Sequence, residues 1–314
     1  MTKPHILSFE TYDEWDSVPM QEAFTVHAFP EGSNPADIAL ELREQIRAFA
    51  FKGHEALGAD IIDAFPNLGL IANYGVGYDT IDVAHATSKG VKVTNTPDVL
   101  TDDVADLAVG MLLALSRDIV GASDWVRSGR WTDSGAFPLQ RTISGMSVGS
   151  VGLGRIGRAV ANRLQAFNTR IHYFARGEKD TPGWTYHANL LDLATEVDIM
   201  MVAVSGGDAT AGLISADVIE ALGPDGLLIN SARGTTLDEE ALIQALQNNR
   251  LRGAALDVFN NEPHIDPRFS TLDNVLLQPH QSSGTVETRK RMGELQRQNL
   301  MAFFASEPLV TPVN

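Results

Sequence analysis

Residues 147–157 read Ser147-Val148-Gly149-Ser150-Val151-Gly152-Leu153-Gly154-Arg155-Ile156-Gly157, and a helical pattern follows over residues 158–164. The first five residues are typical of a β-strand, so the glycines lie between a strand and a helix. In such a turn Gly152 permits the tight bend, Gly154 lets a pyrophosphate approach the backbone, and Gly157 lets the helix pack on the strand. The N–H groups at the start of the helix favour phosphate binding. Residues 152–157 are therefore predicted to bind a dinucleotide.

On both sides of this motif, strand-like runs alternate with helical runs, which predicts parallel sheets. Toward the C-terminus, further strands are expected at residues 170–175, 198–204, 227–232, 253–258 and 275–278, and a long helix at 285–305. Toward the N-terminus, strands are expected at residues 5–9, 48–51, 70–74 and 91–94, with helices at 36–47, 57–65 and 81–88. A turn at Pro97 separates the two series, and a capped helix is expected over residues 101–119. The predicted fold class is α/β, with two doubly wound parallel-sheet domains.

Residues 121–142 show no clear period, although they include Trp125, Trp131 and Phe137. Exposed aromatic side chains on an irregular arm often mark a contact with another chain. A surface loop that packs on its own domain is the alternative interpretation.

Composition excludes several classes of protein. The chain has 314 residues, a formal net charge of −16 and no cysteine. The negative charge disfavours nucleic acid and anionic lipid as partners. The absence of cysteine excludes disulfides and thiolate chemistry and fits a reducing compartment, so the expected location is cytoplasmic. The most apolar helical run, residues 104–115, is too short for a membrane span, and no metal site is expected.

The end of the second strand after the glycine motif indicates which dinucleotide binds. An acidic residue at this place reads the ribose of NAD, whereas a nearby arginine accommodates the 2′-phosphate of NADP. Ala175 stands where the acid is expected, and Arg176 and Lys179 follow it. These cations favour NADP(H). NAD(H), with Glu178 as the ribose acid, is the alternative.

Three residues with the chemistry for carbonyl reduction follow predicted strands of the same sheet. Arg233 comes after the strand at 227–232, Glu262 after the strand at 253–258, and His280 after the strand at 275–278. Open α/β sheets bind ligands at the carboxyl ends of their strands. An arginine can clamp a carboxylate, and a histidine paired with a carboxylate can act as general acid. Taken singly, each residue could equally be a surface or loop residue.

These positions carry motifs that resemble the D-isomer-specific 2-hydroxyacid dehydrogenase family. The motifs are Asn230-Ser231-Ala232-Arg233-Gly234, Asp257-Val258-Phe259-Asn260-Asn261-Glu262-Pro263, Pro279-His280, and Asn73-Tyr74-Gly75-Val76-Gly77-Tyr78-Asp79. They occur in the family's order and cover nearly the whole chain. Within the family, the chain looks most like the glyoxylate and hydroxypyruvate reductases, including the plant-type hydroxyphenylpyruvate reductases.

The resemblance implies roles for these residues. Arg233 would bind the substrate, His280 would be the general acid/base and Glu262 would hold and charge His280. The N–H groups of Val76 and Gly77 would grip the substrate carboxylate. Further candidate substrate contacts are Tyr74 and Ser283, and further candidate cofactor contacts are Thr101, Leu153, Arg155, Ile156, Val204, Ala232 and Asp257.

The resemblance also implies a domain organisation and a reaction. A flavodoxin-like substrate domain would comprise residues 1–98 and 285–314, and a Rossmann cofactor domain would comprise residues 99–284. The protein would be a homodimer, joined largely through the cofactor domain, that reduces a small 2-oxo acid with NADPH. An NAD-dependent dehydrogenase of another 2-hydroxy acid and a non-catalytic dinucleotide-sensing module are the alternatives. The family's proline-containing turn is replaced here by Val204-Ser205-Gly206-Gly207, which leaves the cofactor contacts at that turn open.

Overall fold

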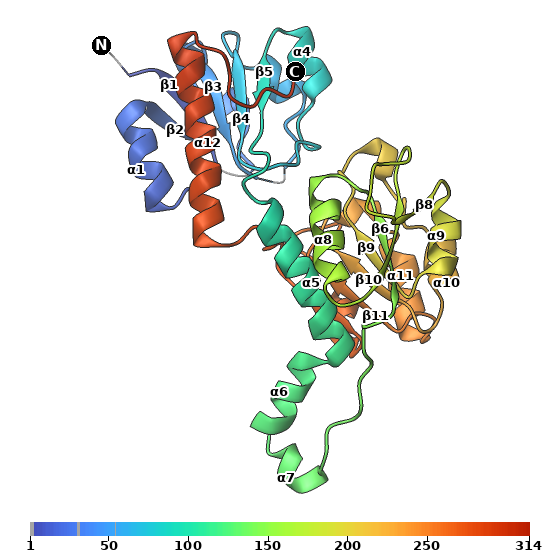
Figure 1. The fold of residues 1–314 in the computed structure, drawn as a ribbon. Helices are drawn as coiled ribbons and strands as arrows, with labels where there is room; N and C mark the ends of the chain where they lie inside the picture. Colours follow the sequence, from blue (N-terminus) through green and yellow to red (C-terminus); the bar gives the residue numbers. More distant parts are fainter. Residues whose placement is uncertain (1–2, 30–31, 54) are drawn as a thin grey trace. The chain divides into compact units, whose positions relative to one another are not determined.

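The computed structural model describes residues 3–29, 32–53 and 55–314. The chain divides into two compact units, Met1–Leu100 with Gly284–Asn314, and Thr101–Ser283. Each unit is built on a parallel sheet of its own (Figure 1). The predicted fold class, two parallel-sheet α/β domains, is confirmed.

The first unit contains a five-stranded sheet in the order β2-β1-β3-β4-β5. Its strands are β1 (His5–Phe9), β2 (Thr25–Phe29), β3 (Ile46–Phe51), β4 (Leu70–Asn73) and β5 (Lys92–Thr94). Its α-helices are α1 (Glu14–Ala23), α2 (Leu40–Arg43), α3 (Ala59–Asp63), α4 (Val83–Ser88) and α12 (Val286–Ala305). This strand order is that of flavodoxin-like sheets.

The last helix, α12, packs in this unit against α1, β3 and β4 (Figure 1). The buried Gln296 of α12 donates hydrogen bonds to the carbonyl oxygens of Phe51 at 3.2 Å and Ala72 at 2.8 Å. Residues separated by more than two hundred positions are thereby joined at the carboxyl ends of β3 and β4. The C-terminal segment is thus an integral part of the first unit.

The second unit contains a seven-stranded sheet in the order β12-β11-β10-β9-β6-β7-β8. Its strands are β6 (Ser147–Val151), β7 (Arg170–Phe174), β8 (Thr185–His187), β9 (Ile199–Val202), β10 (Leu227–Asn230), β11 (Gly253–Leu256) and β12 (Val275–Leu277). Its α-helices are α5 (Thr101–Arg117), α6 (Ile119–Arg127), α7 (Arg130–Ser134), α8 (Arg155–Gln165), α9 (Leu190–Glu196), α10 (Ala216–Leu222) and α11 (Glu239–Gln247). The order reverses between β6 and β9, as in the Rossmann fold, so a ligand crevice is expected at the carboxyl end of β6.

Two apolar cores cover the two faces of this sheet. One core includes Leu193, Val218 and Leu242 from α9, α10 and α11, and the other includes Leu112 of α5 and Leu164 of α8. β6, β9, β10 and β11 are buried throughout because they are covered on both faces.

Three local predictions were wrong. The helix expected over residues 36–47 is limited to α2, because β3 already begins at Ile46. The elements α1 and β2 were not predicted, because Pro19 lies inside α1 and most of β2 is only partly buried, so neither shows a strong sequence pattern. Residues 121–142 are not irregular throughout, because α6 and α7 cover residues 119–134 apart from a short break.

The helices α6 and α7 extend from the end of α5 away from the sheet of their own unit (Figure 1). Asp118 has a left-handed backbone at φ 44°, which ends α5, and its side chain accepts a hydrogen bond from the N–H group of Gly121. Trp131 is 63% exposed and Leu139 is 100% exposed. Within the described residues, no helix combines the length and the apolar character that crossing a bilayer requires.

Candidate functional site

The glycine turn after β6 has the tight geometry that its sequence predicts. Gly152 has φ 94°, and a Cβ atom there would lie 2.7 Å from the carbonyl oxygen of Ala203. A Cβ on Gly157 would lie 2.2 Å from the carbonyl oxygen of Gly152. The hydroxyl of Ser150 donates to that same oxygen at 2.8 Å, which fixes the turn against the end of the strand. Gly152 and Gly157 are therefore required by the protein's own packing.

Gly154 differs from these two glycines. It precedes α8 at the N-cap position, and a Cβ atom there would meet no heavy atom within 4 Å in the described part of the chain beyond its own neighbours in sequence. The space above Gly154 is consequently open, and the first N–H groups of α8, at Arg155 and Ile156, begin beside it. This arrangement fits the pyrophosphate of a dinucleotide, which needs close approach to the backbone at the start of a helix.

The loop after β7 carries the two cations predicted to bind the 2′-phosphate of NADP. Arg176 and Lys179 are both exposed. The hydroxyl of buried Tyr173 accepts a hydrogen bond from the N–H group of Lys179 at 2.9 Å and donates one to its carbonyl oxygen at 3.2 Å. Tyr173 thus holds the loop in a defined conformation from within the core.

Arg233, Glu262 and His280 lie beyond the carboxyl ends of β10, β11 and β12, respectively. These three strands are parallel neighbours in the sheet. Because the carboxyl ends of parallel strands meet at one edge, all three residues belong to the same edge of the second unit. The topology therefore groups the residues that the sequence motifs single out.

The turn that carries Arg233 is fixed by buried polar side chains. Asn230, fully buried at the end of β10, donates to the carbonyl oxygen of Arg233 at 3.0 Å and accepts from the N–H group of Ala232 at 3.0 Å. The hydroxyl of Thr236 donates to the same carbonyl of Arg233 at 2.6 Å. The guanidinium of Arg233 donates from Nη1 to the carbonyl of Ala232 at 2.9 Å. The backbone of Arg233 is thereby held independently of its side chain.

His280 and Glu262 form a close pair. Nδ1 of His280 lies 2.6 Å from Oε2 of Glu262. The other carboxylate oxygen, Oε1, accepts a hydrogen bond from the N–H group of Phe259 at 2.8 Å. The carboxylate is thus oriented by the backbone on one side and meets the imidazole on the other. In this contact Nδ1 carries the proton, which leaves Nε2 to exchange a proton with a ligand.

The loop of His280 is held by a buried aspartate. Asp257, which is fully buried, accepts from the N–H groups of Gln281 at 2.8 Å and Ser282 at 2.9 Å, and also from the hydroxyl of Ser282. His280 itself has φ 49°, a left-handed backbone that is unfavourable for a residue with a side chain. The bonds to Asp257 fix the next two residues and so stabilise this conformation.

Three residues that support the site, Asn230, Thr236 and Ser282, were not predicted as site residues. The hydroxyl of Ser282 engages Asp257, and that of Thr236 engages the Arg233 turn. The sequence signal for Ser282 was Asp257, because an aspartate buried at the end of a strand requires hydrogen-bond donors from nearby loops. Ser283, the predicted substrate contact, directly follows Ser282 and is partly buried.

The remaining cofactor candidates lie at different places in the second unit. Val204 borders the glycine turn, because its Cγ1 would lie 2.9 Å from a Cβ on Gly152. Ala232 belongs to the Arg233 turn, whereas Thr101 is the first residue of α5. Within the described residues, no group of three or more His, Asp or Glu side chains is arranged to hold a metal ion.

The substrate candidates of the first unit form a structured loop after β4. The side chain of Asn73 donates to the carbonyl oxygens of Gly75 at 3.1 Å and Gly77 at 2.8 Å, and that of Asn95 donates to the carbonyl of Val76 at 2.9 Å. With their carbonyls bound in this way, the peptides of residues 75–77 have a fixed orientation. The hydroxyl of Tyr74 donates to the carbonyl of Arg289 at 2.8 Å, and burial raises the pKa of this phenol.

Comparison with known proteins decides the family. Residues 109–282 match the family described as D-isomer specific 2-hydroxyacid dehydrogenase, NAD binding domain. The chain belongs to this family. The chain is 47% identical over 270 residues to the hydroxyphenylpyruvate reductase of Plectranthus scutellarioides, a match that covers 86% of each chain.

Two solved structures from the same family resemble the whole chain. A 2-hydroxyacid dehydrogenase from Ketogulonicigenium vulgare Y25 is 51% identical, with a TM-score of 0.94 over 100% of this chain and 99% of that one. An NADPH-dependent glyoxylate/hydroxypyruvate reductase from Sinorhizobium meliloti, solved with NADP and malonate, is 42% identical with a TM-score of 0.94, covering 99% and 97% of the two chains.

These comparisons confirm the family predicted from the motifs at Arg233, Glu262 and His280, and with it an enzyme of the NAD(P)-dependent dehydrogenase class. The residues that match the NAD binding domain of the family, 109–282, lie within the second unit, which contains the glycine turn. The roles of the individual residues stay predictions.

Proposed function

We propose that this protein reduces a small 2-oxo acid, such as glyoxylate or hydroxypyruvate, to the 2-hydroxy acid with NADPH. The observation that carries the proposal is the 2.6 Å contact between His280 and Glu262, at the same sheet edge as Arg233. A carboxylate–histidine pair beside an arginine supplies an acid and an anion clamp, which are the two groups that reduction of a 2-oxo acid requires from the protein.

Each residue has a defined part in this reaction. When bound, the nicotinamide supplies the hydride for the carbonyl carbon. Arg233 binds the carboxylate and the carbonyl oxygen of the substrate and stabilises negative charge that develops on that oxygen. His280 donates the proton from Nε2, while Glu262 holds Nδ1–H and stabilises the charged ring.

The first unit contributes the loop after β4. The N–H groups of Val76 and Gly77 are proposed to bind the substrate carboxylate. The contact of Asn73 with the carbonyl of Gly75 and that of Asn95 with the carbonyl of Val76 fix the two peptides that carry these N–H groups. Backbone donors held in advance bind an anion with little loss of conformational freedom. This unit is accordingly proposed as the substrate domain, comprising residues 1–98 and 285–314, with residues 99–284 as the cofactor domain. Tyr74 and Ser283 stay proposed as further substrate contacts.

The cofactor is proposed to lie with its pyrophosphate over Gly154 and its 2′-phosphate against Arg176 and Lys179. Thr101, Val204, Ala232 and Asp257 are proposed as further contacts. The support for NADPH over NADH is the absence of an acid at Ala175 and the two exposed cations that follow it. The NADP-bound reductase of Sinorhizobium meliloti agrees with this preference.

A panel of 2-oxo acids, each assayed with NADPH and with NADH, tests the proposal. We expect loss of NADPH absorbance with glyoxylate or hydroxypyruvate, and a lower rate with NADH. A protein that binds NADPH but oxidises it with none of the 2-oxo acids would instead be a dinucleotide-sensing module.

Arg176→Ala is expected to lower kcat/KM with NADPH about tenfold, because the lost charge-assisted contact to the 2′-phosphate is worth about 1.4 kcal/mol. The same variant should leave kcat/KM with NADH almost unchanged, since NADH has no phosphate there. Initial rates at varied cofactor concentration provide the measurement. Equal losses with both cofactors would show that Arg176 has a structural role.

The glycine turn gives a matched pair of variants. Gly157→Ala is expected to lower the free energy of unfolding by about 2 kcal/mol, because the new Cβ meets a backbone oxygen that cannot move freely. Gly154→Ala should lose much less stability than Gly157→Ala, because its Cβ enters open space and only the N-cap preference for glycine over alanine is lost, yet it should bind NADPH at least tenfold more weakly. Thermal unfolding without cofactor and NADPH fluorescence titration measure the two effects. Unchanged NADPH affinity in Gly154→Ala would move the pyrophosphate elsewhere.

We also propose a homodimer that forms largely through the second unit, and a cytoplasmic location. The exposed Trp131 and Leu139 on and after α7 support an interface in this region. The absence of cysteine supports a reducing compartment. Light scattering after size-exclusion chromatography tests the dimer.

A further inference from the structure

A series of contacts connects the first turn of α11 to the Glu262–His280 pair. Glu239 is the first residue of α11, and its Oε1 accepts a hydrogen bond from the N–H group of Asn260 at 2.7 Å. The preceding residue, Phe259, donates its N–H group to Glu262 at 2.8 Å. Glu239 therefore restrains the peptide next to the one that orients the carboxylate of Glu262.

The position of Glu239 is electrostatically unfavourable, although it lies at the start of a helix. The side chain is half-buried, and burial raises its pKa above the ordinary value of a glutamate. Glu262 and Asp266 raise the pKa further by repulsion, whereas the N–H group of Asn260 lowers it. A carboxylate held near two others needs a compensating contact, and the bond to Asn260 provides one.

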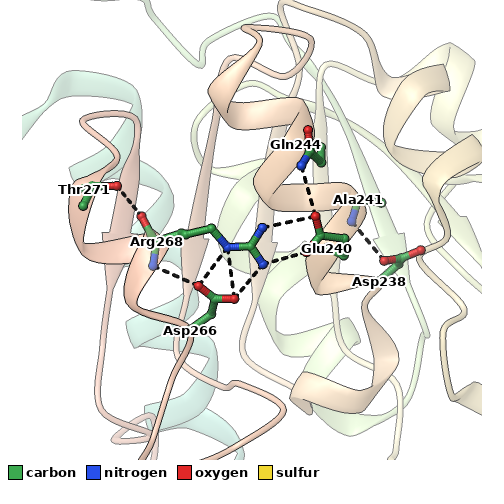
Figure 2. A network of polar contacts seen from close by, with 7 residues as sticks. All are labelled: Asp238, Glu240, Ala241, Gln244, Asp266, Arg268 and Thr271. Atoms are coloured by element: carbon green, nitrogen blue, oxygen red, sulfur yellow. Dashed lines mark hydrogen bonds and ion pairs between the residues drawn. The ribbon is translucent and has the colours of Figure 1, made fainter.

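The side chain of the neighbouring Glu240 contacts a different part of the chain. Arg268 donates to both carboxylate oxygens of Glu240, at 3.1 and 2.6 Å, and also contacts Asp266 (Figure 2). This network joins α11 to the η4 turn, Pro267–Thr271, rather than to the loop before Glu262. The side chain of Glu240 is 59% exposed, so its ion pair contributes little to stability. Glu240 thus offers a control on the same helical turn.

We propose that Glu239 is a positioning residue for the acid/base pair. By holding the N–H group of Asn260, it restrains the peptide that follows Phe259 and so keeps the neighbouring N–H group of Phe259 directed at Glu262. This inference rests on the proposed function, in which His280 donates the proton. Glu239 acts through Glu262, without touching the substrate.

Two substitutions separate the contact from the charge. Glu239→Gln keeps the length and an oxygen that can accept from Asn260, and it should retain kcat within about twofold. Glu239→Asp keeps the charge but shortens the side chain by one methylene, which breaks the contact. We expect Glu239→Asp to lower kcat about tenfold, the factor that corresponds to loss of one hydrogen bond to a charged group, with little change in KM for NADPH. Glu240→Asp should behave like the wild type.

Histidine-ring NMR titration of the four proteins gives a readout that does not depend on turnover. The His280 resonance is identified by its absence in His280→Ala. The midpoint of the His280 titration should move to lower pH in Glu239→Asp, because a displaced Glu262 stabilises the charged ring less. The midpoint should stay near the wild-type value in Glu239→Gln and Glu240→Asp.

Three results would overturn the inference. The first is a His280 titration midpoint in Glu239→Asp that equals the wild-type value. The second is an equal change of kcat or of the midpoint in Glu239→Asp and Glu240→Asp. The third is a larger change in Glu239→Gln than in Glu239→Asp, which would assign the effect to the charge of Glu239. Failure of the proposed function is a distinct result, because it would appear as absence of 2-oxo acid reduction in the wild type whatever the titrations show.

Discussion

Arg233→Lys is expected to lower the turnover of a 2-oxo acid about 100-fold or more and to raise KM for that substrate. The guanidinium can hold the carboxylate and the carbonyl oxygen together, whereas an ammonium group is a single point charge. Loss of one donor to a developing oxyanion commonly reduces kcat by about 10²–10³. Steady-state kinetics with saturating NADPH measure both parameters.

The structure makes this variant a test of chemistry rather than of folding. The backbone of Arg233 is fixed by Asn230 and Thr236 through its own carbonyl oxygen, so replacement of the side chain leaves these bonds in place. Arg250→Lys is a suitable control, because Arg250 forms an exposed ion pair with Glu220. Near-normal turnover of Arg233→Lys would remove Arg233 from the active site, as would equal losses in both variants.

The sheet edge that carries the site could be predicted because it depends on local patterns. Each of β10, β11 and β12 is a short apolar run, and Arg233, Glu262 and His280 come after these three strands in turn. Parallel topology then brings the strand ends together without further information. The positions of Arg233, Glu262 and His280 at one edge thus follow from three independent strand predictions and one rule of topology.

Other features depend on contacts that no local pattern contains. The carboxylate of Asp257 supports Gln281 and Ser282, about 25 residues further along the chain, and the sequence alone suggested only a cofactor contact for it. Similarly, Glu239 reaches Asn260 from a different element. These hydrogen bonds form when loops that follow neighbouring strands pack together, so the spacing of residues in the sequence does not reveal them.

The helices α6 and α7 were missed for a related reason. They have no buried residues within their unit, because their apolar side chains, including Ile119, Val126 and Trp131, are exposed. The apolar pattern of α6 covers only nine residues, so it is a weak signal for a helix. Their ends depend on local chemistry instead: Asp118 begins α6, and Gly129, with φ 80°, separates the two helices. The aromatic residues of the 121–142 segment therefore predicted an exposed segment correctly, whereas the lack of a clear hydrophobic period wrongly predicted an irregular one.

The pH dependence of Glu262→Gln is expected to differ clearly from that of the wild type. In the direction of reduction His280 must be protonated, so kcat/KM falls as pH rises and the imidazolium loses its proton. Glu262 meets Nδ1 at 2.6 Å and favours the charged ring. Removing this carboxylate should therefore move the alkaline limb to lower pH.

The contacts of Glu262 explain why glutamine cannot replace it. One oxygen accepts from the N–H group of Phe259 and the other faces Nδ1 of His280. A glutamine that accepts from Phe259 turns its NH₂ group toward Nδ1, which disfavours a proton there. The reverse orientation sets two donors, the NH₂ group and the N–H of Phe259, against each other. Either arrangement weakens the protonated pair although size is preserved.

His280→Ala and His264→Ala complete this test. His280→Ala should lower kcat about 10³-fold and abolish the limb, because no other group replaces the acid. His264 is exposed and lies two residues from Glu262 in sequence, so His264→Ala should keep the wild-type profile. NADPH affinity should be nearly unchanged in all three variants. An alkaline limb that stays at the wild-type pH in Glu262→Gln would show that Glu262 does not charge His280, and the acid would then act without its proposed carboxylate partner.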